Sequence, residues 1–137
     1  MSVPKLTESF NEKLLTAGWS TRTNRFYPKK ALENIQRQFS PPSIGDFLFS
    51  GDDGYLRLNL DNASHRVSRM YLKNEGTELW AEIHLLDTRC GRLVRDFRRS
   101  GHIRFDCAMT GVMNRFDEVE PESVQFLRVT AYGVYKR

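Results

Sequence analysis

His65 and Cys107 are the two side chains in this sequence whose types could form a catalytic pair. Both lie in stretches that read as β-strands. A histidine can take the proton of a thiol, and the thiolate can then attack a carbonyl carbon. If the two strands are neighbours in one sheet, the pair predicts a cysteine-type peptidase site. The alternative is that Cys107 packs as a small hydrophobic residue and that His65 is an ordinary hydrogen-bonded strand histidine.

A third catalytic member would have to orient His65. His84, Asp87 and His102 are the candidates, and their spacing does not select among them. Asp106 stands directly before Cys107, and its negative charge is expected to raise the pKa of the thiol. A raised pKa weakens the nucleophile, so the neighbouring residues favour the structural interpretation of Cys107.

Two segments that would position these residues read as helices. Residues 28–39 carry apolar side chains at helical spacing on one face, and Pro28 suits the first helical position. Thr88 can cap a second helix over about 89–99. Gly101 follows where a helix C-terminal glycine belongs.

The rest of the pattern alternates in the manner of strands. Strands are predicted at about 13–19, Tyr55 to Leu60, Ser64 to Lys73, Glu78 to Asp87, Ile103 to Met109 and Val124 to Tyr135. Residues 73–77 read as a hairpin loop, residues 1–13 as loosely ordered and residues 43–54 as a loop. The order predicts one α+β domain over residues 1–137, with a mostly antiparallel sheet or barrel and two helices.

Composition limits the class of protein and the kinds of site that the chain can hold. The 137 residues carry a formal net charge of +4 and two cysteines, Cys90 and Cys107. Two cysteines make no disulfide framework, so we expect an intracellular protein with reduced thiols. Neither cysteine belongs to a metal-ligand pattern, and we expect no metal and no cofactor. No apolar run reaches the roughly 20 residues that span a bilayer, and the N-terminus has no signal-peptide core.

Arginines cluster on and around the second predicted helix. Arg92, Arg95 and Arg99 fall on one face at three-to-four spacing. One interpretation is that they bind nucleic-acid phosphates or another acidic partner. The other is that they form a solvated helix face opposite the apolar stripe. The solvated face is the simpler interpretation.

Four segments share their order and spacing with the motifs of one protein family. They are residues 23–33 (TNRFYPKKALE), 60–67 (LDNASHRV), 79–93 (LWAEIHLLDTRCGRL) and 101–111 (GHIRFDCAMTG). They resemble that family's N-G-R-x-Y-P helix entry, its Val-Ser-His strand, its strand-to-helix passage and its A-G-V-x-L-G-V-S-S-R-G turn. The family is the prohead (capsid maturation) proteases of tailed bacteriophages.

The resemblance implies a fold and a chemistry. The fold is that of the herpesvirus assemblins, a small mostly antiparallel β-barrel with two flanking helices. The family's enzymes are serine proteases that cut scaffold and capsid proteins inside the prohead. The resemblance assigns the general base to His65. The family's Ser-Ser-Arg falls on Ala108, Met109 and Thr110, so Cys107 lies one place before the serine pair.

The sequence departs from the family at the residues that do the chemistry. No serine remains in the turn, Thr110 stands for the arginine, and Asp106 stands for a glycine. Residues 45–50 (GDFLFS) stand where the family has G-E-L-G-H-P. We therefore expect a phage virion or head-assembly protein, in the virion or host cytoplasm, that binds capsid proteins without cutting them. The alternatives are an active protease with a Cys107–His65 dyad, and a nucleic-acid-binding module.

Overall fold

A computed structural model of the chain describes residues 6–20, 23–41, 43–49 and 60–133. Six strands form the main sheet, and a two-stranded sheet stands beside it. The main-sheet strands are β1 (Leu6–Thr16), β4 (Ser43–Phe49), β5 (Ala63–Lys73), β6 (Glu78–Leu86), β7 (Ile103–Thr110) and β8 (Gln125–Gly133). The small sheet pairs β2 (Gly18–Ser20) with β3 (Arg25–Tyr27), and the helices are α1 (Lys29–Gln38) and α2 (Arg89–Arg99).

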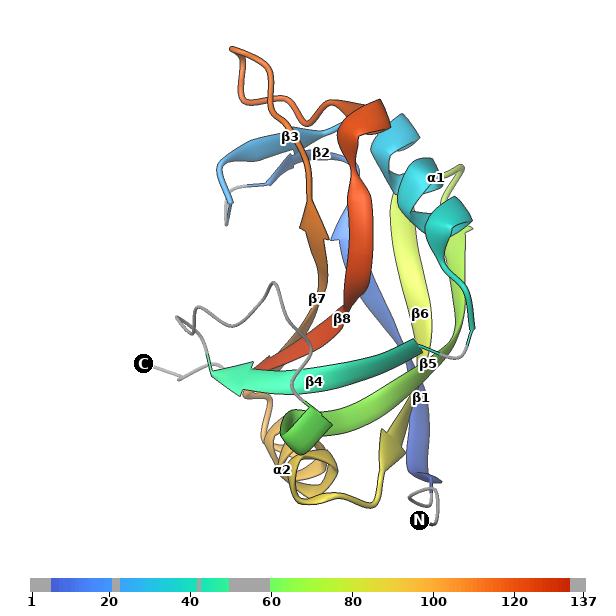
Figure 1. The fold of residues 1–137 in the computed structure, drawn as a ribbon, viewed down its shortest axis with the longest axis vertical. Coiled ribbons are helices and arrows are strands. Elements are labelled where there is room, and N and C mark those ends of the chain that lie inside the picture. The colour runs from blue at the N-terminus through green and yellow to red at the C-terminus, as the bar shows by residue number, and fades with distance from the viewer. Residues whose placement is uncertain (1–5, 21–22, 42, 50–59, 134–137) are drawn as a thin grey trace.

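The main sheet is a strongly curled half-barrel with the strand order β1-β6-β5-β4-β8-β7 (Figure 1). Neighbouring strands are antiparallel except β4 and β8, which pair in parallel. The two edge strands, β1 and β7, approach each other through the rings of Phe10 and Phe105, 5.6 Å apart. No ladder joins these edges in the described part of the chain. The α+β class is confirmed, but the expected barrel is not closed.

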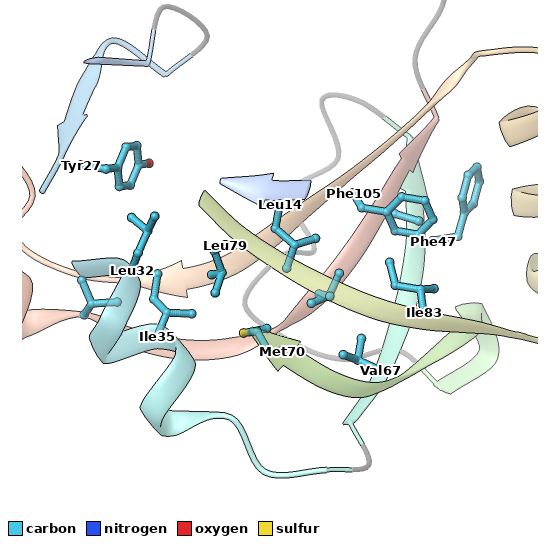
Figure 2. Close-up of a cluster of buried hydrophobic side chains, with 14 of the residues drawn as sticks. Leu14, Tyr27, Leu32, Ile35, Phe47, Val67, Met70, Leu79, Ile83 and Phe105 are labelled. Atoms are coloured by element: carbon cyan, nitrogen blue, oxygen red, sulfur yellow. The ribbon is translucent and has the colours of Figure 1, made fainter. Parts of the chain in front are cut away.

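The core fills the inside of the curl, and α1 closes one end of it (Figure 2). Leu32 and Ile35 of α1 are fully buried, and Figure 2 shows them directed toward Met70 and Leu79 of the sheet. At the other end, the ring of Phe47 on β4 stacks on Phe97 of α2, with centroids 5.8 Å apart. Each helix therefore covers one end of the half-barrel.

The helix boundaries follow the predicted signals closely. Pro28 is the N-cap of α1 rather than its first helical residue, and its extended ψ of 155° shows this. The Thr88 side chain caps α2 by accepting a hydrogen bond from the Gly91 amide at 3.0 Å. Gly101, at φ +78°, lets the His102 amide reach the Phe97 carbonyl at 2.8 Å, which ends the helix.

Two segments differ from the sequence-based expectation. Residues 43–49, predicted as a loop, form β4 between β5 and β8. Residues 6–12, predicted as loosely ordered, belong to β1, which pairs with β6. β1 is an edge strand with many polar side chains, and pairing along one edge holds it without an apolar sequence.

The strand predicted at about 13–19 is divided between β1 and β2, which belong to different sheets. The remaining predicted strands are confirmed where the structure describes them. The loop between β5 and β6 runs through Asn74, Glu75 and Gly76, all at positive φ. Residues 55–59 of the predicted Tyr55–Leu60 strand lie outside the described residues, as does Tyr135. Leu60 begins a short 3-10 turn, Leu60–Asn62.

Candidate functional site

His65 lies on β5, directly opposite Gly45 of β4, and its side chain is completely buried. Nε2 donates a hydrogen bond to the Val129 carbonyl of β8 at 2.8 Å. With that tautomer, Nδ1 accepts a hydrogen bond from the Ser64 hydroxyl at 2.7 Å. Both ring nitrogens therefore have partners inside the protein.

The absence of a side chain at Gly45 makes this arrangement possible. The strand order places β4 between β5 and β8, so the imidazole must cross β4 to reach Val129. A methyl group on Gly45 would overlap both the His65 ring and the Val129 carbonyl oxygen. Gly45 is thus required by a close approach, and not by an unusual backbone angle.

The surroundings of His65 keep its ring neutral. Burial lowers the pKa of His65 to about 4, although the Val129 carbonyl and the Asp46 carboxylate act in the opposite direction. Removal from water disfavours the charged form of a histidine. At neutral pH the ring is an uncharged hydrogen-bonding group, and it is a weak base.

Cys107 lies on β7 and pairs with Val129 of β8. Its side chain is partly buried and packs against the hydrophobic core. Burial raises the pKa of the Cys107 thiol, and the negative charge of Asp106 raises it further. The thiol is therefore protonated at neutral pH, which is the unreactive form.

The structure brings His65 and Cys107 to the same neighbourhood without joining them. Both are partners of Val129, one through its carbonyl and the other through the β7–β8 ladder. The β7 side chain that meets the imidazole is Phe105, whose ring stands edge-on to it with centroids 5.5 Å apart. The two nitrogens of His65 are used by Ser64 and Val129, so neither is directed to a thiol.

Two of the three candidate third members, His84 and Asp87, have partners away from His65. His84 lies on the opposite face of the sheet, where Nε2 meets Glu82 Oε1 at 3.0 Å and Ser68 Oγ at 2.9 Å. Asp87 is exposed and pairs with Arg92 at 2.9 Å. The residue that orients His65 is Ser64, its neighbour in sequence. The Ser-His dipeptide was the only sequence signal for it.

A second polar cluster was not found by sequence reasoning. The Asp46 carboxylate is fully buried, and its Oδ1 accepts from Arg128 Nε at 3.0 Å and from Thr130 Oγ1 at 2.9 Å. These residues join β4 to β8, 82 and 84 positions apart in the sequence. Because Asp46 fell in a predicted loop, no signal indicated that it would be buried.

A cleft of about 340 Å³ lies between the two edge strands, at the opening of the half-barrel. Residues 13–16 of β1 and residues 104–106 of β7 line it, together with Trp19. Neither His65 nor Cys107 is among its lining residues. Phe105 lines the cleft on one side and meets the His65 ring on the other, so a ligand in this cleft would contact the phenyl ring and not the imidazole.

The arginines of α2 are mostly engaged in ion pairs. Arg98 reaches Glu12 of β1 at 3.1 Å, and Arg99 reaches Glu8 at 3.7 Å. Arg92 and Arg95 pair with acidic neighbours on or next to the helix. The helix therefore presents little unbalanced positive charge for phosphate.

Over the residues that the structure describes, no three His, Cys, Asp or Glu side chains are grouped as metal ligands would be. Within the same residues, no helix has the length and apolar character needed to cross a membrane.

Comparison with known proteins identifies a fold and no sequence relative. No protein-family model and no curated protein matches the sequence. Among solved structures, the capsid assembly protease gp21 of bacteriophage T4 is similar, with a TM-score of 0.64 and 15% sequence identity. The match covers 98% of this chain and 90% of gp21. At this identity the likeness shows the fold, and it agrees with the fold that the sequence resemblance implied.

Proposed function

We propose that this chain is a phage head-assembly protein that binds capsid proteins on a protease-like fold and does not cut them. The fold is like that of a capsid assembly protease over nearly the whole chain, which supports the capsid partner. The observation that carries the loss of proteolysis is the state of His65. A general base must have a free nitrogen within hydrogen-bond reach of the nucleophile, and this ring has none.

The facing strand supports the same proposal. Ala108 and Met109 stand where the resemblance places the serine pair, and neither side chain can attack a carbonyl. The protonated Cys107 thiol packs against the hydrophobic core. The competing dyad of Cys107 and His65 would need the buried imidazole to give up its hydrogen bonds to Ser64 or Val129.

We assign the proposed binding to an exposed apolar surface. We name it the hairpin-end surface, and it comprises Trp19, Phe26, Val112, Met113 and Phe116, which are 38–68% exposed. Trp19 and Phe26 are direct cross-strand partners in the β2–β3 pair. Two main-chain hydrogen bonds hold the loop after β7 against β3. The Phe26 amide donates to the Asp117 carbonyl and the Val119 amide donates to the Phe26 carbonyl, both at 2.9 Å. Exposed apolar side chains gathered at one place are typical of protein-binding surfaces.

Proteolysis is tested with the purified chain, the major capsid and scaffolding proteins of the same phage, and labelled casein. We expect no cleavage of any of them. Cleavage that disappears in both His65→Ala and Cys107→Ala would overturn the proposal and establish the dyad.

Binding is tested separately by co-sedimentation with assembled capsid protein. We expect the wild-type chain to sediment with the shells. The double variant Trp19→Ser/Phe116→Ser should lose most of this binding, while Leu127→Ser, an exposed leucine on β8, should keep it. Absence of the wild-type chain from the pellet would contradict the proposed partner.

A further inference from the structure

The outer face of β1, β6 and β5 carries aromatic and basic side chains in register. Lys13 pairs with Trp80 across β1 and β6, and Trp80 pairs with Tyr71 across β6 and β5. Arg69 and Lys73 flank Tyr71 at two-residue spacing on β5, so they share its face. We name these five residues the outer-face platform. They lie on the face opposite to the buried His65, and Lys13 also lines the edge-strand cleft together with Trp19.

Hydrogen bonds at their edges fix the two aromatic rings of the platform. The Tyr71 hydroxyl donates to Asn11 Oδ1 at 2.8 Å, and the Trp80 indole N–H donates to Glu78 Oε1 at 3.0 Å. Directly paired residues on neighbouring strands are about 5 Å apart, so the two rings lie side by side on the sheet. The two rings are therefore neighbours on one face, and each is held by a hydrogen bond.

The cations of the platform lie over these rings. The Arg69 guanidinium is 4.3 Å from the Tyr71 ring centroid, and the Lys73 ammonium is 4.1 Å from that of Trp80. Among the described residues, no carboxylate lies within 4.0 Å of the charged nitrogens of Arg69 or Lys73. The arginines of α2 differ in this respect, since four of them have acidic partners.

Two glutamates share this face, and both are engaged by neighbours. Glu78 is held by the Trp80 indole and lies 3.8 Å from Lys13. Glu82 accepts hydrogen bonds from Ser68 and His84, which lower the pKa of its carboxyl group. Arg69 is the cross-strand partner of Glu82, and its positive charge lowers the pKa of that carboxyl group further. The platform thus has two rings fixed by hydrogen bonds and two cations, Arg69 and Lys73, that lie over them.

We propose that the outer-face platform binds single-stranded nucleic acid. Tyr71 and Trp80 stack on successive bases, and Arg69, Lys73 and Lys13 move to the phosphates. Stacking on a base replaces an exposed cation–π contact, which is the weaker interaction, and the displaced cation gains a phosphate. An acidic peptide would use the charges and leave the two rings without a partner. A duplex would offer phosphates while keeping its bases inside.

The test uses fluorescein-labelled dT15 and fluorescence anisotropy at low salt. We expect Trp80→Leu to weaken binding at least fivefold, as the loss of one stacked base does, and Trp80→Phe to restore most of it. Lys73→Gln should make the slope of log K against log salt shallower by about 0.7. Trp19→Leu and Arg95→Gln are the matched controls, and both should bind as the wild type does.

The Trp19→Leu variant also supplies a direct signal, because Trp80 is then the remaining tryptophan of the two. Its fluorescence should be quenched by unlabelled dT15. Four outcomes would overturn the proposal: no binding at low salt, equal affinity for a 15-residue polyglutamate, stronger binding of a 15-base-pair duplex, or no loss in Trp80→Leu. The Trp80, Lys73 and Arg95 variants leave His65 and the hairpin-end surface unchanged, so a failure of this test leaves the head-assembly proposal to its own tests.

Discussion

The imidazole of His65 on β5 donates a hydrogen bond to the Val129 carbonyl on β8 across the intervening strand β4. A side-chain hydrogen bond that spans a strand needs a gap in the middle strand, and Gly45 provides it. This bond joins β5 to β8 and passes over β4, so it links all three strands. It also occupies the nitrogen that a catalytic base would use.

Gly45→Ala should destabilise the protein strongly, because the added methyl group has no space beside the ring and the carbonyl. We expect a loss of about 2–3 kcal/mol in the free energy of unfolding, measured by urea denaturation. Gly111→Ala is the matched control. A methyl group there meets its nearest neighbour at 3.5 Å, an ordinary contact, so the midpoint should hardly move. Equal effects of the two substitutions would contradict the close packing at Gly45.

Stability should fall as the pH is lowered from about 6.5 to about 4. The pKa of His65 is lowered to about 4 in the folded protein, so over this interval the unfolded chain binds a proton that the folded chain does not. Stability is therefore full above the unfolded pKa and declines toward the folded one, with a total loss of about 3 kcal/mol.

The pH dependence is measured by urea denaturation at several pH values. The His65→Gln variant should lose this component of the slope, whereas His84→Gln should retain it, because His84 is partly exposed on the outer face. A wild-type slope that survives in His65→Gln would assign the effect to another group.

Cys107 should react slowly with iodoacetamide in the native protein at pH 7, because burial and Asp106 raise the pKa of its thiol. In a Cys90→Ala background, we expect labelling at least a hundredfold slower than in the urea-unfolded chain. His65→Ala should not slow it further. Fast labelling that depends on His65 would instead indicate an activated thiol.

Arg128→Met should cost about 3–5 kcal/mol, since it leaves the buried Asp46 carboxylate without its charged partner. The control is Arg95→Met on α2, which removes an ion pair with the well-exposed Asp96. That change should alter stability by less than about 1 kcal/mol. Comparable losses from both variants would show that the burial of Asp46 has no energetic consequence.

Local signals predicted the local parts of the fold well. The Thr88 cap and the Gly101 terminus bound α2 within the predicted residues, and the 73–77 loop joins β5 to β6. Each of these features depends on residues a few positions apart. They can be read from sequence because the same few residues form the hydrogen bonds.

The long-range parts could not be read in the same way. β4 carries glycine and aspartate in its middle, which argues against a strand until Gly45 is seen under the His65 ring and Asp46 beside Arg128. β1 is polar because its outer face meets solvent. In both strands the pairing partner decides the structure, and the partners are distant in sequence.

In the candidate site, too, the local contact could be predicted from the sequence and the long-range contact could not. The resemblance directed attention to His65, and the adjacent Ser64 is indeed its hydrogen-bond partner. The contact with Val129 lies 64 residues away and involves a main-chain carbonyl, which no residue pattern marks. The prediction of Cys107 and His65 as vestigial catalytic residues stays a prediction, and the thiol-labelling experiment addresses it.

The parallel junction of β4 and β8 has a kinetic consequence. The β5–β6 hairpin closes a short loop and can form within microseconds, but β4 must find β8 some 84 residues further along the chain. Pairing of such distant segments slows folding to the order of milliseconds to seconds. The Asp46–Arg128 pair can form only when that junction does. Its loss should therefore slow refolding as well as speed unfolding.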